Sequence, residues 1–224
     1  MRSRLALLAA ATLLLSSACV ARAQERGSES TSYVIVEHEE PSFTVLAVTG
    51  GIVPPLAGDV AARLARIPAG RRVLIDLDSA GGEMAEGLKL IALLKREKER
   101  RQIDTLVYYG HLCASMCVPV YMMGKRRYAA AVSNWMFHPA HFGPLPVIDR
   151  GATVRVLDLM VDLGISRRYL TQLDDEDVFS TDSEYWTTGS ELYAEKAGIV
   201  TDLLPQKLRH PDPEIAFDPQ IQPR

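Results

Sequence analysis

Short apolar runs that resemble strands alternate with segments of helical periodicity along most of this 224-residue sequence. Residues 73–77 and 103–108 are strand-like, and residues 83–98 between them carry apolar side chains at helical spacing. Strands joined through helices by short connections predict an α/β fold with a mainly parallel sheet. In such sheets, binding and catalytic residues gather at the carboxyl ends of the strands.

The same patterns predict the remaining elements and the domain limits. Further strands are expected at 33–36, 44–48, 128–137 and 199–201, and further helices at 59–67, 115–123, 153–163, 166–173 and 191–196. A loop rich in Gly and Pro (139–151) and an acidic loop (174–186) separate the later elements. One domain is expected over 33–204, after a flexible segment (24–32) and before a proline-rich, disordered tail (205–224).

The first 23 residues have the pattern of a signal peptide. Arg2 and Arg4 precede an apolar run over residues 5–15, which is too short to span a bilayer as a stable helix. Ala21-Arg22-Ala23 fits an A-x-A cleavage site, so the mature chain is expected to begin at Gln24. The protein is therefore expected in the periplasm or outside the cell; an uncleaved membrane anchor is the alternative.

Composition narrows the class of protein. Hydrophobic residues make up 47% and charged residues 24%, as in an ordinary globular chain. The formal charge is -3, and cleavage after Ala23 removes three arginines and no acids, which changes it to -6. This balance argues against nucleic acid or an anionic membrane surface as partner. No spacing of His, Cys and Asp matches a metal site, and we expect neither a metal nor an organic cofactor.

Ser115 is the strongest candidate for a nucleophile. It lies in H-L-C-A-S-M-C, expected directly after a strand and at the start of a helix. Such a turn lifts the hydroxyl out of the sheet, and the helix N-terminus supplies N–H groups for a developing oxyanion. A helix N-cap is the alternative reading of the same serine, because Ser is a preferred cap.

Two glycines precede the next helix, at Gly81-Gly82 after the strand 73–77. Glycine lets the backbone approach a substrate closely and point an N–H inward. Together with Ser115, this pair predicts an oxyanion hole whose other donor is the N–H of Met116. Taken alone, Gly81-Gly82 is more typical of a plain turn between strand and helix.

His138 is the candidate base. It ends the strand-like W-M-F-H, and a strand end holds a ring rigidly against a hydroxyl; a core or surface histidine is the alternative. His141 lies in the following loop and is a weaker candidate. A third group should orient the imidazole, and the acidic loop offers Asp177, Asp182 and Glu184.

Cys113 and Cys117 remain once Cys19 leaves with the signal peptide, and an even pair in an oxidising compartment favours a disulfide. In one regular helical turn their Cβ atoms would be about 5–6 Å apart. A disulfide needs about 3.5–4.5 Å. A bridge therefore requires Cys113 to precede the helix, on the turn that carries Ser115; two buried thiols are the alternative.

Four segments, in this order, resemble the proteolytic subunit of the Clp protease family. They are L-I-D-L-D-S-A-G-G-E-M-A-E-G, C-A-S-M-C, W-M-F-H-P and W-T-T-G-S-E-L-Y-A-E-K-A-G-I-V-T, within residues 44–202. The sequence is most similar to an exported branch of this family, in which paired cysteines flank the serine and G-K-R-R-Y follows.

The resemblance implies a crotonase-like core of stacked βαβ units and a Ser-His-Asp triad. Carried over by motif, Ser115 is the nucleophile, His138 the base, and Gly82 and Met116 the oxyanion donors. Matching the acidic loop to the exported branch points to Asp182, which we prefer, and matching it to the proteolytic subunit points to Glu184. A homo-oligomer, often a ring, is also implied, whereas no ATPase partner is expected outside the cytoplasm.

Three functions compete at this point. The preferred one is a serine hydrolase, of peptidase type, that acts on peptide or protein substrates through an acyl-enzyme. The alternative is a catalytically silent binding or assembly module with the same fold. An acyl-CoA enzyme of crotonase type is disfavoured, because CoA is a cytoplasmic cofactor and the chain is expected to be exported.

Overall fold

The structure is a computed structural model, and it describes residues 32–143 and 147–204. The expected signal peptide (1–23), most of the segment 24–32 and the tail 205–224 lie outside the described residues. The predictions made for those segments therefore stay predictions.

The described residues form nine strands and six helices in an alternating order. In chain order they are β1 (Tyr33–Glu39), β2 (Phe43–Gly50), α1 (Leu56–Leu64), β3 (Arg72–Asp78), α2 (Met84–Glu97), β4 (Ile103–Val107), β5 (Leu112–Ala114), α3 (Cys117–Tyr121), β6 (Arg127–Ala130), β7 (Asn134–Phe137), α4 (Arg150–Asp162), α5 (Arg167–Asp175), β8 (Tyr185–Thr188), α6 (Gly189–Ala194) and β9 (Asp202–Leu204).

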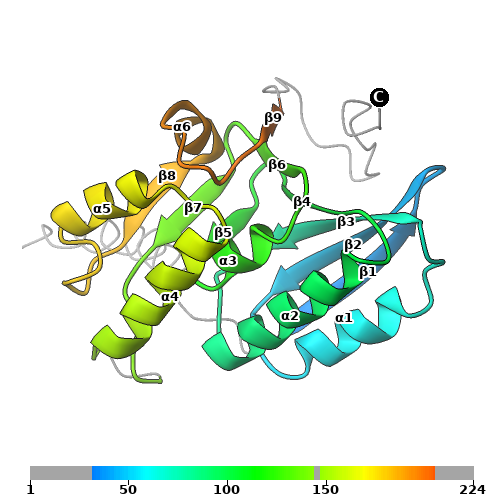
Figure 1. Cartoon of the computed structure of the whole chain (residues 1–224), viewed down its shortest axis with the longest axis horizontal. Helices are drawn as coiled ribbons and strands as arrows, with labels where there is room; N and C mark the ends of the chain where they lie inside the picture. The colour runs from blue at the N-terminus through cyan, green and yellow to red at the C-terminus, as the bar shows by residue number, and fades with distance from the viewer. Residues whose placement is uncertain (1–31, 144–146, 205–224) are drawn as a thin grey trace, which may run out of the picture.

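Two sheets organise the molecule. The larger one has the order β1-β2-β3-β4-β6-β9, in which only β1 runs antiparallel to its neighbour. The smaller one has the order β5-β7-β8, with β5 parallel and β8 antiparallel to β7. Helices α1 and α2 lie against one face of the larger sheet (Figure 1). The predicted α/β fold with a mainly parallel sheet is confirmed.

The main core lies between the sheets and their helices. It includes Leu46, Ile75 and Leu94 from the larger sheet and α2, and Trp135 from the smaller sheet, all buried. Because successive side chains of a strand point to opposite faces, Phe43, Val45 and Leu74 lie on the other face. There they form a second buried cluster with residues of β4, β6 and β9: Leu106, Tyr128 and Leu204.

Two predictions about secondary structure need correction, and two short strands were missed. Residues 128–137 are not one strand but β6 and β7 in different sheets, because a turn in which Ser133 N–H donates to Ala130 O separates them. Residues 199–201 are not a strand, since the Arg127 side chain takes up the Ile199 carbonyl; the strand is β9, just beyond. Strand β5 was not predicted, and neither was β8, whose first two residues were expected in the acidic loop 174–186.

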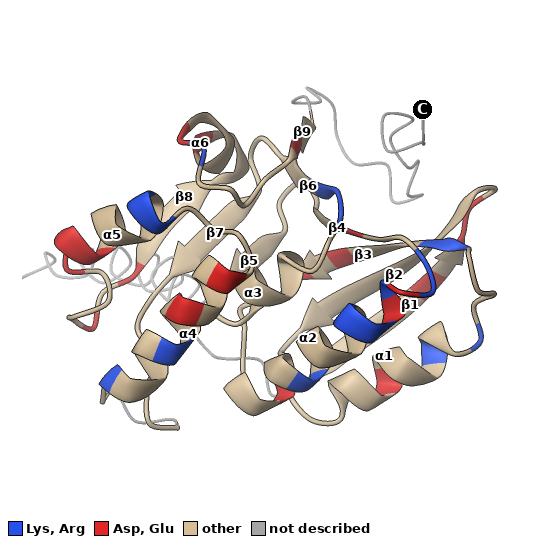
Figure 2. Cartoon of the chain, viewed as in Figure 1, with Lys and Arg blue, Asp and Glu red and all other residues tan. Residues whose placement is uncertain are grey.

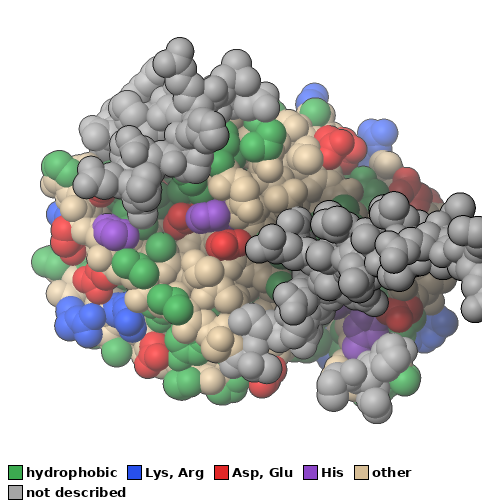
Figure 3. All heavy atoms as spheres, turned by 180° about the vertical axis from the view of Figure 1, so that it is seen from behind, with side chains coloured by type: hydrophobic (Ala, Val, Ile, Leu, Met, Phe, Trp, Pro, Cys, Tyr) green, Lys and Arg blue, Asp and Glu red, His purple; other side chains and the backbone are tan. Residues whose placement is uncertain are grey.

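Residues of both charge signs occur along helices α1, α2, α4 and α5 (Figure 2). The opposite face of the molecule likewise mixes acidic, basic and hydrophobic side chains over its described part (Figure 3). None of the described helices is long and apolar enough to span a membrane.

Candidate active site

Ser115 occupies a left-handed backbone conformation between β5 and α3, with φ +53°. This conformation is uncommon for a residue with a side chain, and such strained residues cluster at functional sites. The strand that precedes Ser115 is β5 of the smaller sheet, not the predicted strand 103–108, and α3 starts two residues after it rather than at it. Ser115 therefore lies on the turn itself, not within the helix.

Several contacts hold Ser115 in this conformation. Its N–H donates to Met136 O of β7 (3.0 Å), and its carbonyl accepts from Val118 N of α3 (3.1 Å). Gly81 packs directly against it: a Cβ added to this glycine would lie 2.6 Å from Ser115 Cβ and 3.0 Å from Met116 N. The structure thus ties the serine turn to β7, to α3 and to the glycine turn.

A disulfide joins Cys113 to Cys117 across the serine turn, with their Cα atoms 5.2 Å apart. Cys113 lies in β5 and Cys117 begins α3, so the bridge spans the boundary between strand and helix. This placement agrees with the requirement that Cys113 precede the helix. Both cysteines are fully buried.

His138 follows the last residue of β7, the strand that runs parallel to β5. The register pairs Ala114 with Met136, so the chain positions that follow the two strands lie side by side. Ser115 and His138 both line one pocket of about 420 Å³. Pockets of this size hold small ligands or side chains of a larger substrate.

The two predicted oxyanion donors also meet at this pocket, which both Gly82 and Met116 line. Ile52 pairs with the glycine turn by accepting from Glu83 N and donating to Gly81 O, which leaves Gly82 N–H out of the pairing. Among the described residues, neither Gly82 N–H nor Met116 N–H donates to a backbone carbonyl. Both groups can therefore donate to a substrate oxygen.

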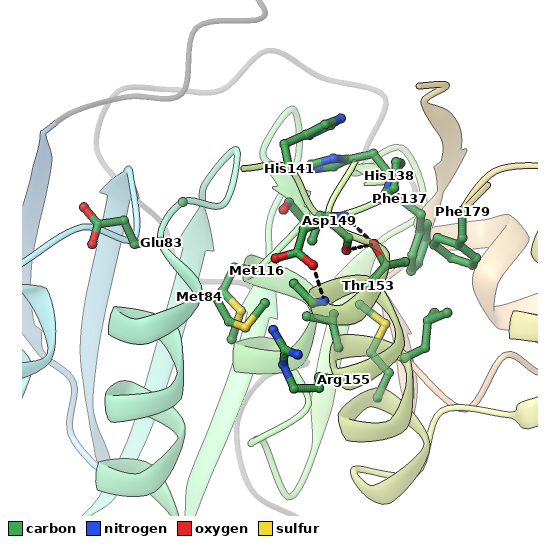
Figure 4. A pocket seen from close by; sticks show the side chains of 18 of the residues that line it. Glu83, Met84, Met116, Phe137, His138, His141, Asp149, Thr153, Arg155 and Phe179 are labelled. Atoms are coloured by element: carbon green, nitrogen blue, oxygen red, sulfur yellow. Dashed lines mark hydrogen bonds between the residues drawn. The ribbon is translucent and has the colours of Figure 1, made fainter. Parts of the chain in front are cut away.

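The pocket walls are largely apolar, with charged groups among them (Figure 4). The apolar lining includes Met84, Met116, Phe137, Met160 and Phe179, and the charged lining consists of Glu83, Asp149 and Arg155 together with the two histidines. Within the described residues, no group of three or more His, Cys, Asp or Glu side chains could hold a metal ion.

The loop after His138 is fastened to the start of α4. Ala140 N donates to the Thr153 hydroxyl (3.0 Å), and Asp149 N donates to Ala140 O (2.8 Å). Asp149 in turn caps α4, since its carboxylate accepts from Ala152 N (2.8 Å). Because α4 forms one wall of the pocket, these bonds fix that wall relative to His138.

Asp182 and Glu184, the two candidate acids, each contact a side chain other than His138. The carboxylate of Asp182 lies 2.8 Å from Nε2 of His141, and that of Glu184 accepts from the Trp186 indole N–H at 2.9 Å. His141 in turn stacks on His138, with ring centroids 5.4 Å apart and an angle of 16° between the planes. Asp177, the third acid of this loop, accepts a hydrogen bond from Ser180.

Strand pairing explains why the acidic loop lies beside the segment that carries His138 and His141. Phe137 pairs with Tyr185 in the antiparallel β7–β8 ladder, so residues just before Tyr185 lie beside those just after Phe137. The sequence analysis named the acids of this loop and ranked His141 as a weak candidate, and the structure joins His141 to Asp182. The sequence signal that could have pointed to His141 is H-P-A-H, in which a second histidine follows three residues after the first.

No protein-family model and no curated protein sequence matches this chain. Solved structures do. A ClpP1 mutant from Listeria monocytogenes superposes with a TM-score of 0.55 at 18% identity, over 73% of this chain and 92% of that one. The ClpP protease catalytic domain from Plasmodium falciparum superposes with a TM-score of 0.50 at 22% identity, over 75% of this chain and 88% of that one.

These similarities define the class of fold: the chain adopts the fold of Clp protease catalytic domains. At such identities the likeness concerns the fold, and the role of each residue depends on the site geometry above.

Proposed function

We propose that this protein is a serine hydrolase of peptidase type, with Ser115 as nucleophile and His138 as general base. The observation that carries the proposal is the left-handed turn of Ser115 at a pocket that His138 and two N–H groups, those of Gly82 and Met116, also line. A nucleophile, a base and oxyanion donors around one cavity are the parts that acyl transfer requires.

In the proposed reaction, Ser115 Oγ attacks the carbonyl carbon of an amide or ester while its proton passes to His138. The N–H groups of Gly82 and Met116 donate to the oxyanion that forms. Collapse of this intermediate breaks the bond to the leaving group, which takes the proton from His138. Water then attacks the acyl-enzyme carbonyl while His138 accepts a proton from it. Collapse of this second intermediate breaks the bond to Ser115 Oγ, which takes that proton from His138, and the carboxylic acid leaves.

Labelling with a fluorophosphonate probe tests the proposal. The wild-type protein should form a covalent adduct on Ser115, located by peptide mass spectrometry. Ser115→Ala should abolish the adduct and His138→Ala should slow it by at least about a hundredfold. Ser190→Ala, on α6 outside the pocket, is the matched control and should label like the wild type.

The same experiment separates the enzyme from a silent binding module. A folded wild-type protein that resists the probe at every serine would favour the binding module. Among the described residues, no backbone carbonyl accepts from the N–H of Gly82 or Met116, and this supports the enzyme, because acyl transfer requires donors left open beside the nucleophile.

We also propose that the chain is exported and cleaved after Ala23. The buried Cys113–Cys117 bridge supports this, because disulfides persist in oxidising compartments. N-terminal sequencing of exported protein should begin at Gln24. We further propose that the mature protein forms a homo-oligomer, and light scattering on the mature protein tests this.

A further inference from the structure

We infer that Asp182 assists His138 through His141, so that the acid of the site acts across a second histidine rather than by direct contact. This inference rests on the proposed function. Asp182 and His141 are positioning residues in it, and His138 remains the group that exchanges the proton.

The geometry forms a connected chain of three side chains. Asp182 Oδ1 lies 2.8 Å from His141 Nε2, within hydrogen-bond range for a charge-assisted pair. The rings of His141 and His138 are nearly parallel at 5.4 Å between centroids. Figure 4 shows both histidines side by side at the rim of the pocket, with His141 facing His138.

The backbone around both partners is well fixed. His141 pairs with Ile148 in an antiparallel bridge, and Phe142 N donates to Val147 O beside it. On the other side, the carbonyl of Asp177 accepts from both the N–H and the hydroxyl of Thr181, the residue before Asp182. Two separately anchored loops thus meet in the His141–Asp182 contact.

This arrangement has an electrostatic consequence for the reaction. When His138 takes the proton of Ser115, it becomes a cation whose ring faces His141. A neutral His141 hydrogen-bonded to ionised Asp182 carries a net charge of -1, which stabilises that cation and opposes rotation of the ring. The His141–Asp182 contact therefore performs both tasks of a triad acid, which are to orient the base and to compensate its charge. It does so through the ring of His141 instead of by direct contact with His138.

Three other charged groups lie at the same pocket. Glu83 at the start of α2 and Asp149 and Arg155 of the α4 segment line the same pocket. Asp149 is committed to capping α4, and the charges of Glu83 and Arg155 are opposite in sign. Asp182 is consequently the acid that the structure couples to the stacked rings.

The test measures fluorophosphonate labelling of Ser115 in the full chain as a function of pH. Asp182→Asn should lower the plateau rate about tenfold, equivalent to ~1.4 kcal/mol of transition-state stabilisation. It should also move the midpoint of the acid limb to lower pH by on the order of half a unit, because removing a nearby negative charge favours neutral His138.

Two substitutions at His141 separate positioning from mere packing. His141→Gln keeps an N–H that can donate to Asp182 and should retain most of the plateau rate. His141→Leu keeps bulk but removes the donor and should lose about as much as Asp182→Asn. Asp175→Asn, an exposed acid at the end of α5, controls for the loss of one charge and should leave both the rate and the midpoint unchanged.

Each outcome decides the inference. Equal labelling rates and midpoints for wild type, Asp182→Asn and His141→Leu would overturn it while leaving the proposed function intact. A large loss in Glu184→Gln with none in Asp182→Asn would overturn it in favour of the other acid. A wild-type protein that never labels at Ser115 would overturn the proposed function itself, and this inference with it. Melting temperatures of all variants identify any loss that comes from unfolding.

Discussion

Gly81 and Ser115 lie so close together that a methyl group on the glycine would be 2.6 Å from the serine Cβ. Real Cβ atoms do not approach this closely, and the neighbouring atoms are the Ala114 carbonyl and Met116 N–H rather than flexible side-chain ends. The two turns, from β3 and from β5, are therefore built against one another. The position of the proposed nucleophile depends on a residue 34 positions away in the sequence.

Gly81→Ala should reduce fluorophosphonate labelling of Ser115 by at least about tenfold, because the serine turn and Met116 N–H must shift. The matched control is Gly70→Ala. Gly70 also has positive φ (+84°, against +97° for Gly81), but an added Cβ there meets nothing within 4 Å. Both substitutions should cost about 1–2 kcal/mol of stability from the left-handed backbone. Equal labelling of both variants would contradict the role assigned to the contact.

The Cys113–Cys117 bridge should matter more to the nucleophile than to global stability. It closes a very small loop, so replacing both cysteines by alanine should lower the free energy of unfolding by no more than about 2 kcal/mol. The labelling rate of Ser115 should fall further than this loss explains, because the turn loses its covalent brace. Thiol counting on unreduced protein checks that the bridge is present, and labelling at wild-type rate in the double variant would exclude the supporting role.

The residue types of the site, though not their contacts, were accessible from sequence. Ser115, Gly82 and Met116 could be singled out because a strand–turn–helix pattern specifies where a nucleophile and its N–H donors belong. His138 could be singled out because it ends a strand-like segment, where a ring can be held rigidly. The contact of His141 with Asp182 could not be predicted, since it depends on the β7–β8 register that brings two distant loops together.

The same limit explains the errors in secondary structure. Strand β5 has only three residues, which are too few to show an alternating pattern in the sequence. Its position is set by pairing with β7. Residues 128–137 looked like one strand because both β6 and β7 are apolar, and only the tertiary fold assigns them to different sheets. Local patterns thus predicted strands β1 to β4 of the larger sheet well, its strands β6 and β9 less accurately, and the smaller sheet poorly.

Asp104 should be among the most sensitive positions for stability. It is fully buried in β4, where its carboxylate accepts from the Arg72 guanidinium (2.5 Å) and from Arg126 N (2.9 Å). Asp104→Ala removes the carboxylate that pairs with the buried Arg72 guanidinium, and should cost about 3–5 kcal/mol in urea unfolding. Asp158→Ala, an exposed acid on α4, should stay within about 0.5 kcal/mol of wild type. A loss below about 1 kcal/mol for Asp104→Ala would mean that the pair contributes little.

The Asp76–His111 pair predicts that stability declines as the pH rises from 6 to 8. His111 Nδ1 lies 3.3 Å from Asp76 Oδ1, and Asp76 is largely buried. Burial raises the pKa of Asp76, although its bond to His111 opposes this. Desolvation lowers the pKa of His111, but the hydrogen bond and charge of Asp76, with the charge of Asp78, outweigh it and raise the pKa overall.

Both shifts act in the same direction. Because the folded state binds the His111 proton more tightly than the unfolded chain, this stabilisation is complete below the ordinary histidine pKa of 6.5 and is lost as the pH rises through the higher folded value. Ionised Asp76 is disfavoured in the fold, so the contribution of Asp76 to stability also falls with rising pH.

Urea unfolding of wild type should therefore give a larger free energy of unfolding at pH 6 than at pH 8. His111→Gln should flatten the difference by removing the titrating partner, whereas His38→Gln, on the exposed hairpin strand β1, should preserve it. A wild-type stability that rises between pH 6 and pH 8, or a His111→Gln profile identical to wild type, would show that this pair does not control the pH dependence.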